Sequence, residues 1–421
     1  MSHRAFNILI SGAGFENKGA EAMLRTVQQQ LARRIPDSTF WLEPSRVRQS
    51  VAFQYGYDMP YSPESAIRRS AKLLRSLIRN PGLLPLLRFE KIAWSLSQLP
   101  ALNAFIDISG FSFSDEWGVE RARKRSIYSA YFSRNRAPVF FLPQAWGPFD
   151  NPKVAHFTRR AISQARLACP RDPQSLAYVE GLVGKSRDNV LLCPDIAFLF
   201  EGAAPDVGRA LLAGLGLAGE RRPLVGIVPN LRVYERAEGK GLANAYLRAL
   251  GAVARRFIEN LGARLVLAPN DESVPGAPVL DDRYLCSLLE LLIDDKANCR
   301  VVRDYWPAEN FKALWGQVDF LLSSRFHGLV FALSQGVPVA AIGWSHKYVE
   351  LLKPFGLSEF VFDHGKLDSD AIWAALEQAW NRRSESRAAI QERLPAIRSS
   401  VERLFDLVAE KIVRAEAKRA S

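Results

Sequence analysis

An arginine and a histidine stand together in the C-terminal third of the chain, between two apolar stretches. Residues 323–328 have the sequence SSRFHG and lead through an apolar run to a Gly-Val-Pro turn at 336–338. Arginine offers a planar guanidinium that suits phosphate or carboxylate, and histidine can donate a proton near neutral pH. Arg325 and His327 therefore predict a site that binds an anion and transfers a proton.

The surrounding pattern predicts that this pair lies at the end of a β-strand. Residues 319–322 are typical of a buried strand, and residues 328–335 are typical of a helix. Open α/β sheets bind ligands at the carboxyl edge of their strands, where the N–H groups and the positive dipole end of a following helix also attract anions. We expect Ser324, Arg325 and His327 to face such a ligand.

A second cationic loop is predicted at the same edge. The next strand, 339–342, is followed by GWSHK, which supplies His346 and Lys347, and no Asp or Glu occurs between Phe320 and Tyr348. Two such loops without acids favour a small polyanion. The alternative is that Arg325 pairs with a carboxylate from another loop, that His327 is a hydrogen-bonded core residue, and that Lys347 is solvated surface.

Alternating strand and helix patterns predict an α/β protein with two Rossmann-like, doubly wound parallel-sheet domains. We expect an N-terminal domain at 1–205, a Gly/Ala-rich linker at 202–222, a C-terminal domain at 222–395, and a helix at 396–421 that crosses back over both. A length of 421 residues suits two cores. The predicted strands are 6–10, 39–42, 104–108, 138–142, 166–169 and 190–192, then 224–228, 264–267, 300–303, 319–322 and 339–342.

The charge balance predicts an anionic partner, because 56 Lys+Arg against 44 Asp+Glu give a formal charge of +12. The basic amphipathic stretch 67–79 suggests contact with a membrane surface, although a solvated helix face is the simpler interpretation. Basic residues do not alternate with aromatic ones along a groove, which argues against nucleic acid. Four scattered cysteines and the lack of a long apolar run favour a cytoplasmic protein, peripheral at the inner membrane if it touches one, with no metal site.

Several short motifs occur in an order that resembles the polysaccharide pyruvyl transferases. Besides Arg-x-His and Gly-x-Pro, they are a Gly/Asn loop at 12–19, DISG at 107–110, LPQAWGP at 142–148, RD at 171–172 and PD at 194–195. The resemblance covers about residues 6–365 and points to the exopolysaccharide branch of colanic acid and amylovoran type. It implies a GT-B-like pair of domains.

The resemblance implies a reaction in which phosphoenolpyruvate donates its pyruvyl group to two hydroxyls of a hexose, as a ketal, with release of phosphate. Phosphoenolpyruvate would be a co-substrate, and no cofactor is expected. We expect Arg325, Lys347 and His346 to hold the donor, Arg232 to clamp its phosphate, and His327 to act as the acid. Arg232 could also be an ordinary surface arginine.

The acceptor, an oligosaccharide that is free or lipid-linked, is expected on the N-terminal domain. Residues 110–118 form an aromatic loop after a strand, in which Trp117 could stack on a sugar and Asp115 or Glu116 could accept hydroxyl protons. Gln144 and Trp146 are expected to join them, with Asn17 and Lys18 from the Gly/Asn loop. The alternative is a packed loop whose carboxylates are solvated.

Two other functions are compatible with these patterns. A GT-B glycosyltransferase that uses a nucleotide sugar would share the Gly-Val-Pro turn, although many retaining members carry a glutamate pair that is missing here. A non-catalytic scaffold that binds anionic glycan would keep the fold and the cations. Release of phosphate from phosphoenolpyruvate would separate the transferase from both.

Overall fold

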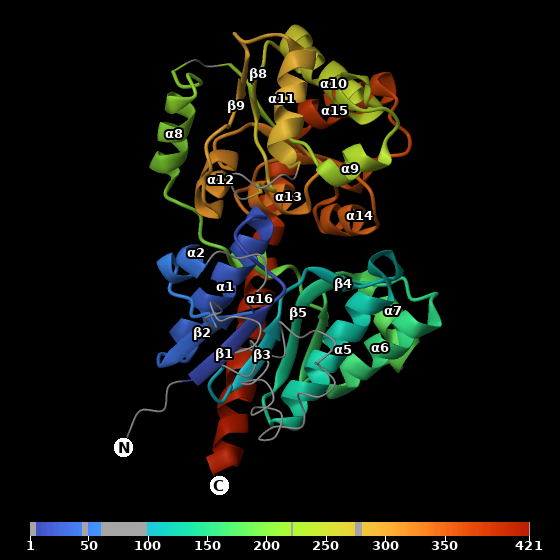
Figure 1. The fold of residues 1–421 in the computed structure, drawn as a ribbon. Coiled ribbons are helices and arrows are strands. Elements are labelled where there is room, and N and C mark those ends of the chain that lie inside the picture. Colours follow the sequence, from blue (N-terminus) through green and yellow to red (C-terminus); the bar gives the residue numbers. More distant parts are fainter. Residues whose placement is uncertain (1–5, 44–48, 60–98, 220–221, 274–279, 421) are drawn as a thin grey trace, which may run out of the picture. The chain divides into compact units, whose positions relative to one another are not determined.

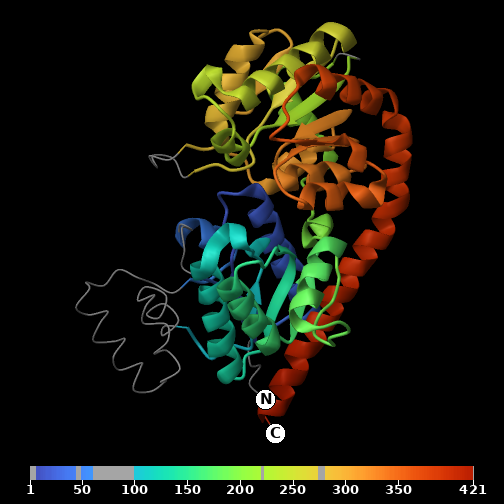
Figure 2. The ribbon, with the colours of Figure 1, turned by 90° about the vertical axis from the view of Figure 1, so that its right-hand side faces the viewer.

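The computed structural model describes residues 6–43, 49–59, 99–219, 222–273 and 280–420, so the basic stretch 67–79 lies outside the described residues. The chain forms two compact units, which are drawn in Figures 1 and 2. The N-terminal unit contains the first strand, Met23–Ile196 and Ser400–Ser421. The C-terminal unit contains Ala197–Ser399 together with Glu16–Ala22, a short segment that we expected in the N-terminal domain.

The N-terminal unit is built on a parallel sheet with the order β2-β1-β3-β5-β4, and β6 pairs with β5. Its strands are almost entirely apolar and buried, as expected for a sheet covered on both faces. They are β1 (Phe6–Ser11), β2 (Ser38–Leu42), β3 (Ala104–Asp107), β4 (Phe111–Phe113), β5 (Val139–Trp146) and β6 (Leu167–Pro170).

Helices cover both faces of this sheet. Right-handed crossovers place α1 on one face and α5 and α6, which pack on each other, on the opposite face. The last part of α16 lies beside α1, where Arg34 pairs with Asp406 at 2.7 Å. The helices are α1 (Lys18–Arg34), α2 (Gln49–Gln54), α5 (Gly118–Arg134), α6 (Pro152–Gln164), α7 (Pro173–Val183) and α16 (Arg383–Ala420), the long red helix of Figure 2.

The C-terminal unit has a second parallel sheet, with the order β12-β11-β10-β7-β8-β9. The strands are β7 (Leu224–Val228), β8 (Arg264–Leu267), β9 (Cys299–Val301), β10 (Phe320–Ser323), β11 (Val339–Gly343) and β12 (Val361–Asp363). The helices are α8 (Pro205–Gly214), α9 (Leu231–Arg236), α10 (Ala245–Leu261), α11 (Asp282–Ile293), α12 (Ala308–Trp315), α13 (Phe326–Leu333), α14 (Lys347–Leu352) and α15 (Ser369–Asn381), with α16 shared between the units. The predicted class of two doubly wound α/β domains is confirmed.

Short 3₁₀ helices and two small strands complete the architecture. The 3₁₀ helices are η2 (Asp115–Trp117), η3 (Ile196–Leu199), η4 (Gly241–Ala243), η5 (Lys353–Phe355) and η6 (Ser358–Phe360). The prediction of a strand at 190–192 was wrong, because only an isolated bridge joins Val190 to Ala168 there. The short strands β4 and β12 were not predicted.

The strand order creates one switch point in each sheet, where neighbouring strands send their helices to opposite faces. In the N-terminal unit it lies between β1 and β3, and in the C-terminal unit between β7 and β10. Ligands of open α/β sheets bind outside the carboxyl ends of the strands at such points. The loops that follow β7 and β10 begin at Pro229 and Ser324, so the Arg-x-His motif lies at a switch point.

A buried lysine gives the C-terminal unit a predicted pH dependence. Burial and the nearby Arg398 lower the pKa of Lys312 to about 7, although its ammonium donates to the carbonyl of Phe200. Between pH 7 and 10 the unfolded chain therefore holds a proton that the folded chain has lost, and the free energy of unfolding rises with pH by up to about 1.4 kcal/mol per unit. Lys312→Met should flatten this slope in urea titrations between pH 7 and 9. Equal slopes in the variant and the unmodified protein would contradict the prediction.

Candidate functional site

The guanidinium of Arg325 is held by two carboxylates of the C-terminal unit. Its Nε and Nη2 donate to Asp282 at 2.8 and 2.5 Å, and Nη1 donates to Asp271 at 3.3 Å. The expectation of an acid-free site around Arg325 was therefore wrong. Asp271 follows β8 and Asp282 begins α11. Both lie at the carboxyl edge of the sheet, where β10 ends, although they are distant from Arg325 in the sequence.

Asp282 fixes the orientation of the Arg325 guanidinium. It is fully buried, and its oxygens also accept backbone N–H groups of Leu231, Asn270 and Asp271. Burial lowers the pKa of Arg325, but Asp282 and Asp271 outweigh this effect and raise it, so the guanidinium stays charged. Within the part of the chain that the structure describes, three of its five N–H donors are used, which leaves two for a bound anion.

Ser324 holds the loop in place instead of facing a ligand. It is buried, its carbonyl accepts from Asn230 at 2.6 Å and Tyr348 at 2.7 Å, and its Oγ accepts from Tyr246 at 2.7 Å. These bonds tie the loops after β7, β10 and β11 together. The predicted contact between Ser324 and the donor is therefore corrected to a structural role for this side chain.

The Gly/Asn loop meets the Arg-x-His motif within the C-terminal unit. A Cβ placed on Gly19 would lie 2.0 Å from Cγ and Nδ1 of His327, so the backbone of α1 packs directly on the imidazole. Asn17 caps α1 by accepting from the N–H groups of Gly19 and Ala20, both at 3.1 Å, and donates to Asp271 at 3.3 Å. Asp271 thus contacts both Asn17 and Arg325, which brings two separate motifs to one place.

Gly19→Ala is expected to displace the imidazole of His327, because the added methyl would overlap the ring. A shift of about 1 Å in a reacting group can cost about a hundredfold in rate, and overpacking costs about 1–3 kcal/mol of stability. Turnover and urea denaturation would measure both effects. Gly181→Ala is the control, since this helical glycine has open space around its Cβ position; a fully active Gly19→Ala would show that the ring is not held there.

Lys18 is not available to an acceptor. Its ammonium is completely buried, 3.0 Å from Glu272, 3.5 Å from Glu21 and 3.7 Å from the centre of the Tyr305 ring. Burial lowers the pKa of Lys18, but the two carboxylates outweigh this effect and raise it. The side chain of Lys18 therefore anchors the start of α1 in the C-terminal unit. This corrects the prediction that Lys18 binds an acceptor on the N-terminal domain.

The other predicted donor-binding cations lie on α9 and around the start of α14. Lys347 and Arg236 lie on the indole of Trp344, at 4.1 and 4.5 Å from the ring centre. His346 is half-buried beside Lys347, whereas the guanidinium of Arg232 is exposed and pairs with Glu235 at 2.8 Å. Sequence reasoning missed Trp344 and Arg236. The spacing of Arg232 and Arg236 on one face of a helix was the available signal.

In the N-terminal unit, two predicted acceptor residues are core residues. Trp146 is completely buried, stacks on Phe113 with 4.7 Å between ring centres, and donates from Nε1 to the carbonyl of Cys169. Gln144 is also completely buried and accepts from the backbone of Ser112. The structure therefore does not place either side chain where a sugar could reach it, because β5 extends through residue 146 as a buried strand.

The aromatic loop after β3 is partly accessible. Asp115 accepts from the backbone N–H groups of Asp150 and Asn151, so its carboxylate holds the neighbouring turn. Glu116 is exposed, and Trp117 is half-buried beneath the guanidinium of Arg121, which lies 4.5 Å from the ring centre. Solvent can therefore reach Asp115, Glu116 and Trp117, the three predicted acceptor residues of this loop.

A buried ionic network lies beneath the switch point of the N-terminal unit and was not predicted. Arg125 of α5 pairs with Asp107 at 2.8 Å and donates to Ser11 at 2.5 Å, while Ser11 and Tyr128 donate to Glu43. Burial raises the pKa of Glu43, but Arg125 and Lys124 outweigh it and hold the pKa below its ordinary value. The network joins the ends of β1, β2 and β3.

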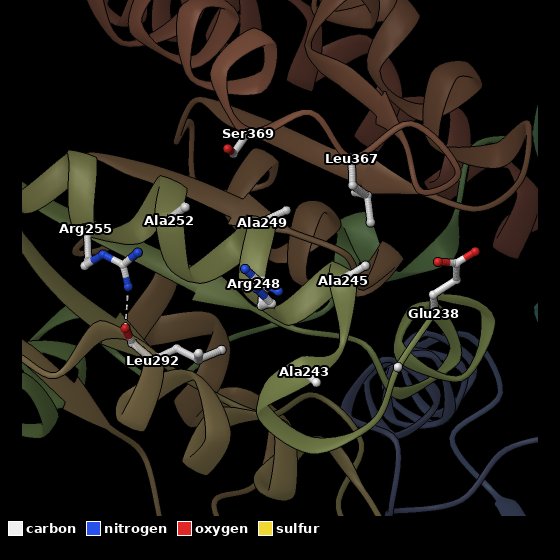
Figure 3. Close-up of a pocket in the computed structure, with 11 residues that line it drawn as sticks. Glu238, Ala243, Ala245, Arg248, Ala249, Ala252, Arg255, Leu292, Leu367 and Ser369 are labelled. Atoms are coloured by element: carbon white, nitrogen blue, oxygen red, sulfur yellow. Dashed lines mark hydrogen bonds between the residues drawn. The ribbon is translucent and has the colours of Figure 1, made fainter.

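A pocket of about 630 Å³ on the C-terminal unit contains none of the predicted site residues. Figure 3 shows that one face of α10 lines it, and that Arg255 donates to the carbonyl of Leu292. Glu238 and Arg248 give it mixed charge.

Within the described ranges, no group of three or more His, Cys, Asp or Glu side chains could hold a metal ion, and no helix is long and apolar enough to span a membrane.

The fold places the protein in the GT-B-like class of two-domain α/β proteins. The UDP-GlcNAc 2-epimerase of Neisseria meningitidis matches with a TM-score of 0.57 and 11% identity, over 98% of this chain and 100% of that chain. HepE of Anabaena, solved with UDP-glucose, matches with a TM-score of 0.53 and 13% identity, over 95% and 99% of the chains. At such identities these likenesses concern the fold alone.

The sequence comparisons define the family. The model of the family described as polysaccharide pyruvyl transferase matches residues 17–346, which include the last three residues of the Gly/Asn loop and the whole Arg-x-His motif. The amylovoran biosynthesis protein AmsJ of Erwinia amylovora is 23% identical over 334 residues, which are 78% of this chain and 79% of that protein. This chain belongs to the polysaccharide pyruvyl transferase family.

Proposed function

We propose that the protein transfers the pyruvyl group of phosphoenolpyruvate to a hexose of a bacterial exopolysaccharide, or of its lipid-linked precursor, as a cyclic ketal. The family match supports a pyruvyl transferase. The name of AmsJ, an amylovoran biosynthesis protein, supports an exopolysaccharide as the acceptor. The observation that carries the proposal is the position of Arg325 and His327 at the switch point of the C-terminal sheet.

The donor would bind at the start of α13. Arg325 has two N–H donors left for a carboxylate or phosphate oxygen, and the first turn of α13 adds backbone N–H groups and a positive dipole end. The cluster of Arg325, Asp271 and Asp282 carries one more negative than positive charge, so it alone would repel a polyanion. Lys347, Arg232 and Arg236 would have to supply the missing positive charge.

His327 would supply a proton to the reaction. When one sugar hydroxyl adds to C2 of phosphoenolpyruvate, C3 takes up a proton and becomes a methyl group. A second hydroxyl of the same hexose then replaces phosphate at C2, and the leaving phosphate carries away the bridging oxygen. An imidazole beside the donor can protonate C3 or the leaving group, and packing of Gly19 on the ring would fix its direction.

The proposal is tested by incubating the protein with phosphoenolpyruvate and a panel of oligosaccharides on lipid carriers. We expect acceptor-dependent release of inorganic phosphate and a product heavier by one pyruvyl ketal in mass spectrometry. Turnover with UDP-sugars and none with phosphoenolpyruvate would point to a glycosyltransferase. Binding of anionic glycan without turnover of any donor would point to a scaffold.

A further inference from the structure

A pocket of about 530 Å³ in the N-terminal unit is lined by charged residues of one sign. Its charged lining residues are Arg136, Arg166, Lys418 and Arg419. They come from three parts of the chain: the turn before β5, the turn before β6, and the last turn of α16. The fold therefore gathers cations that the sequence separates widely.

The pocket lies at the amino edge of the sheet, away from the candidate acceptor residues. Arg136 precedes β5 and Arg166 precedes β6, so both lie where these strands begin. Gly12 and Ser109, which mark the switch point, follow the ends of β1 and β3. Because all the strands are parallel, these are opposite edges of one sheet. The pocket is thus separate from the site proposed for transfer, and its role does not depend on that reaction.

Among the described residues, three of the four cations have no carboxylate partner. Arg419 pairs with Glu416 at 3.5 Å and donates to the carbonyls of Leu102 and Asn135, at 2.8 and 2.6 Å, and so anchors α16. Arg136, Arg166 and Lys418 are exposed, and no carboxylate in the described ranges lies within 4.0 Å of their charged groups. These three like charges repel each other until an anion binds between them.

The remaining lining indicates which anion fits. Ala137, Pro138, Ala165 and Ala415 are small, and the lining has neither an aromatic ring to stack on a base or sugar nor a carboxylate to accept sugar hydroxyls. Phosphate needs only positive charge and N–H donors. Recognition here is therefore directed to a phosphate group and not to a nucleoside or a glycan.

The basic surface continues beyond the pocket. Arg134, at the end of α5, and Arg160, near the end of α6, are exposed and likewise have no carboxylate within 4.0 Å among the described residues. A single soluble phosphate would use only the pocket, whereas a surface that carries many phosphates would use the surrounding cations as well. We propose that this pocket and its rim bind the phosphates of anionic phospholipid head groups.

The test is co-sedimentation of the full chain with vesicles of phosphatidylcholine alone or mixed with phosphatidylglycerol. Each cation near an anionic bilayer contributes about a factor of five in partitioning, so Arg136→Gln/Arg166→Gln/Lys418→Gln should reduce binding to the mixed vesicles about a hundredfold. The matched control is Lys296→Gln/Arg248→Gln/Arg393→Gln, which removes two arginines and one lysine from exposed positions of the C-terminal unit. It should change binding less than tenfold. Circular dichroism would verify that both variants are folded.

Several results would overturn the proposal. Equal losses in the two triple variants would mean that only total charge matters, and equal binding of the unmodified protein to both kinds of vesicle would mean that head-group phosphate is not recognised. Titration calorimetry with glycerol phosphate tests whether the pocket binds a soluble phosphate ester. Heat that the pocket variant abolishes, without any preference for phosphatidylglycerol vesicles, would assign the pocket to a soluble phosphate ester instead.

Discussion

Replacing Arg325 by lysine is expected to lower kcat/KM for pyruvyl transfer about a thousandfold. Loss of one preorganised donor in an enclosed anion site costs about a hundred- to a thousandfold, and lysine cannot reproduce the planar fork that Asp282 orients. Lysine keeps the positive charge beside the buried carboxylate of Asp282, which protects the fold. Phosphate release at several donor concentrations would give kcat and KM separately.

Two further variants separate binding from folding in this experiment. Arg264→Lys changes another buried arginine of the C-terminal unit, whose guanidinium donates to the carbonyls of Gly216 and Leu217, and should cost stability but not activity. Asp282→Asn would place an amide NH2 group where a carboxylate oxygen accepts at least two N–H groups, so it should lower both stability and activity. If Arg264→Lys lost as much activity as Arg325→Lys, the role of Arg325 would be structural.

Replacing His327 by glutamine is expected to lower kcat by a factor of about a hundred to ten thousand, with a much smaller change in KM. Glutamine fills similar space and can still donate a hydrogen bond, but it cannot deliver a proton to C3. Half-buried His327 contacts Gly19 and Phe326, so the substitution should leave stability nearly unchanged. Single-turnover measurements would show whether the chemical step is the one that slows.

Two other histidines, His156 and His346, provide the comparison with His327. His156→Gln changes an exposed residue of α6 and should leave kcat unchanged, whereas His346→Gln tests the half-buried histidine beside Lys347. A kcat that falls in His346→Gln and not in His327→Gln would move the acid to the loop after β11.

The strands and the position of Arg325 could be predicted because they depend on local patterns. Apolar runs of four to six residues bounded by Gly, Pro and Ser gave β7, β8, β10 and β11 within one or two residues. The carboxyl edge then followed from the direction of the chain. Nothing in that reasoning depends on which strands are neighbours.

The partners of Arg325 could not be predicted, because they depend on the order of the strands in the sheet, which local patterns do not reveal. Asp282 and Asp271 precede Arg325 by 43 and 54 residues, and they meet it only because β8 lies two positions from β10 in the sheet. The lack of Asp and Glu between Phe320 and Tyr348 therefore could not predict the net charge of the site. Lys18 was misplaced similarly, since its carboxylate partner Glu272 lies far along the chain.

Trp146 shows a different limit. The sequence LPQAWGP contains a proline and polar residues, which favoured a turn after residue 142. In the structure β5 continues to Trp146, since Ala145 and Trp146 pair with β4 and the indole stacks on Phe113. Tertiary contacts with a strand of only three residues outweighed the local preference, and the aromatic ring became core.

The grouping of Glu16–Ala22 with the C-terminal unit means that the two halves of this protein cannot be produced by cutting the chain once. A fragment that begins at Ala197 would lack the ammonium that neutralises Glu272, the amide that contacts Asp271 and the glycine that packs on His327. Its donor loop would be incomplete even if the second sheet formed. Recombination within this family should therefore exchange the first turn of α1 together with the C-terminal half.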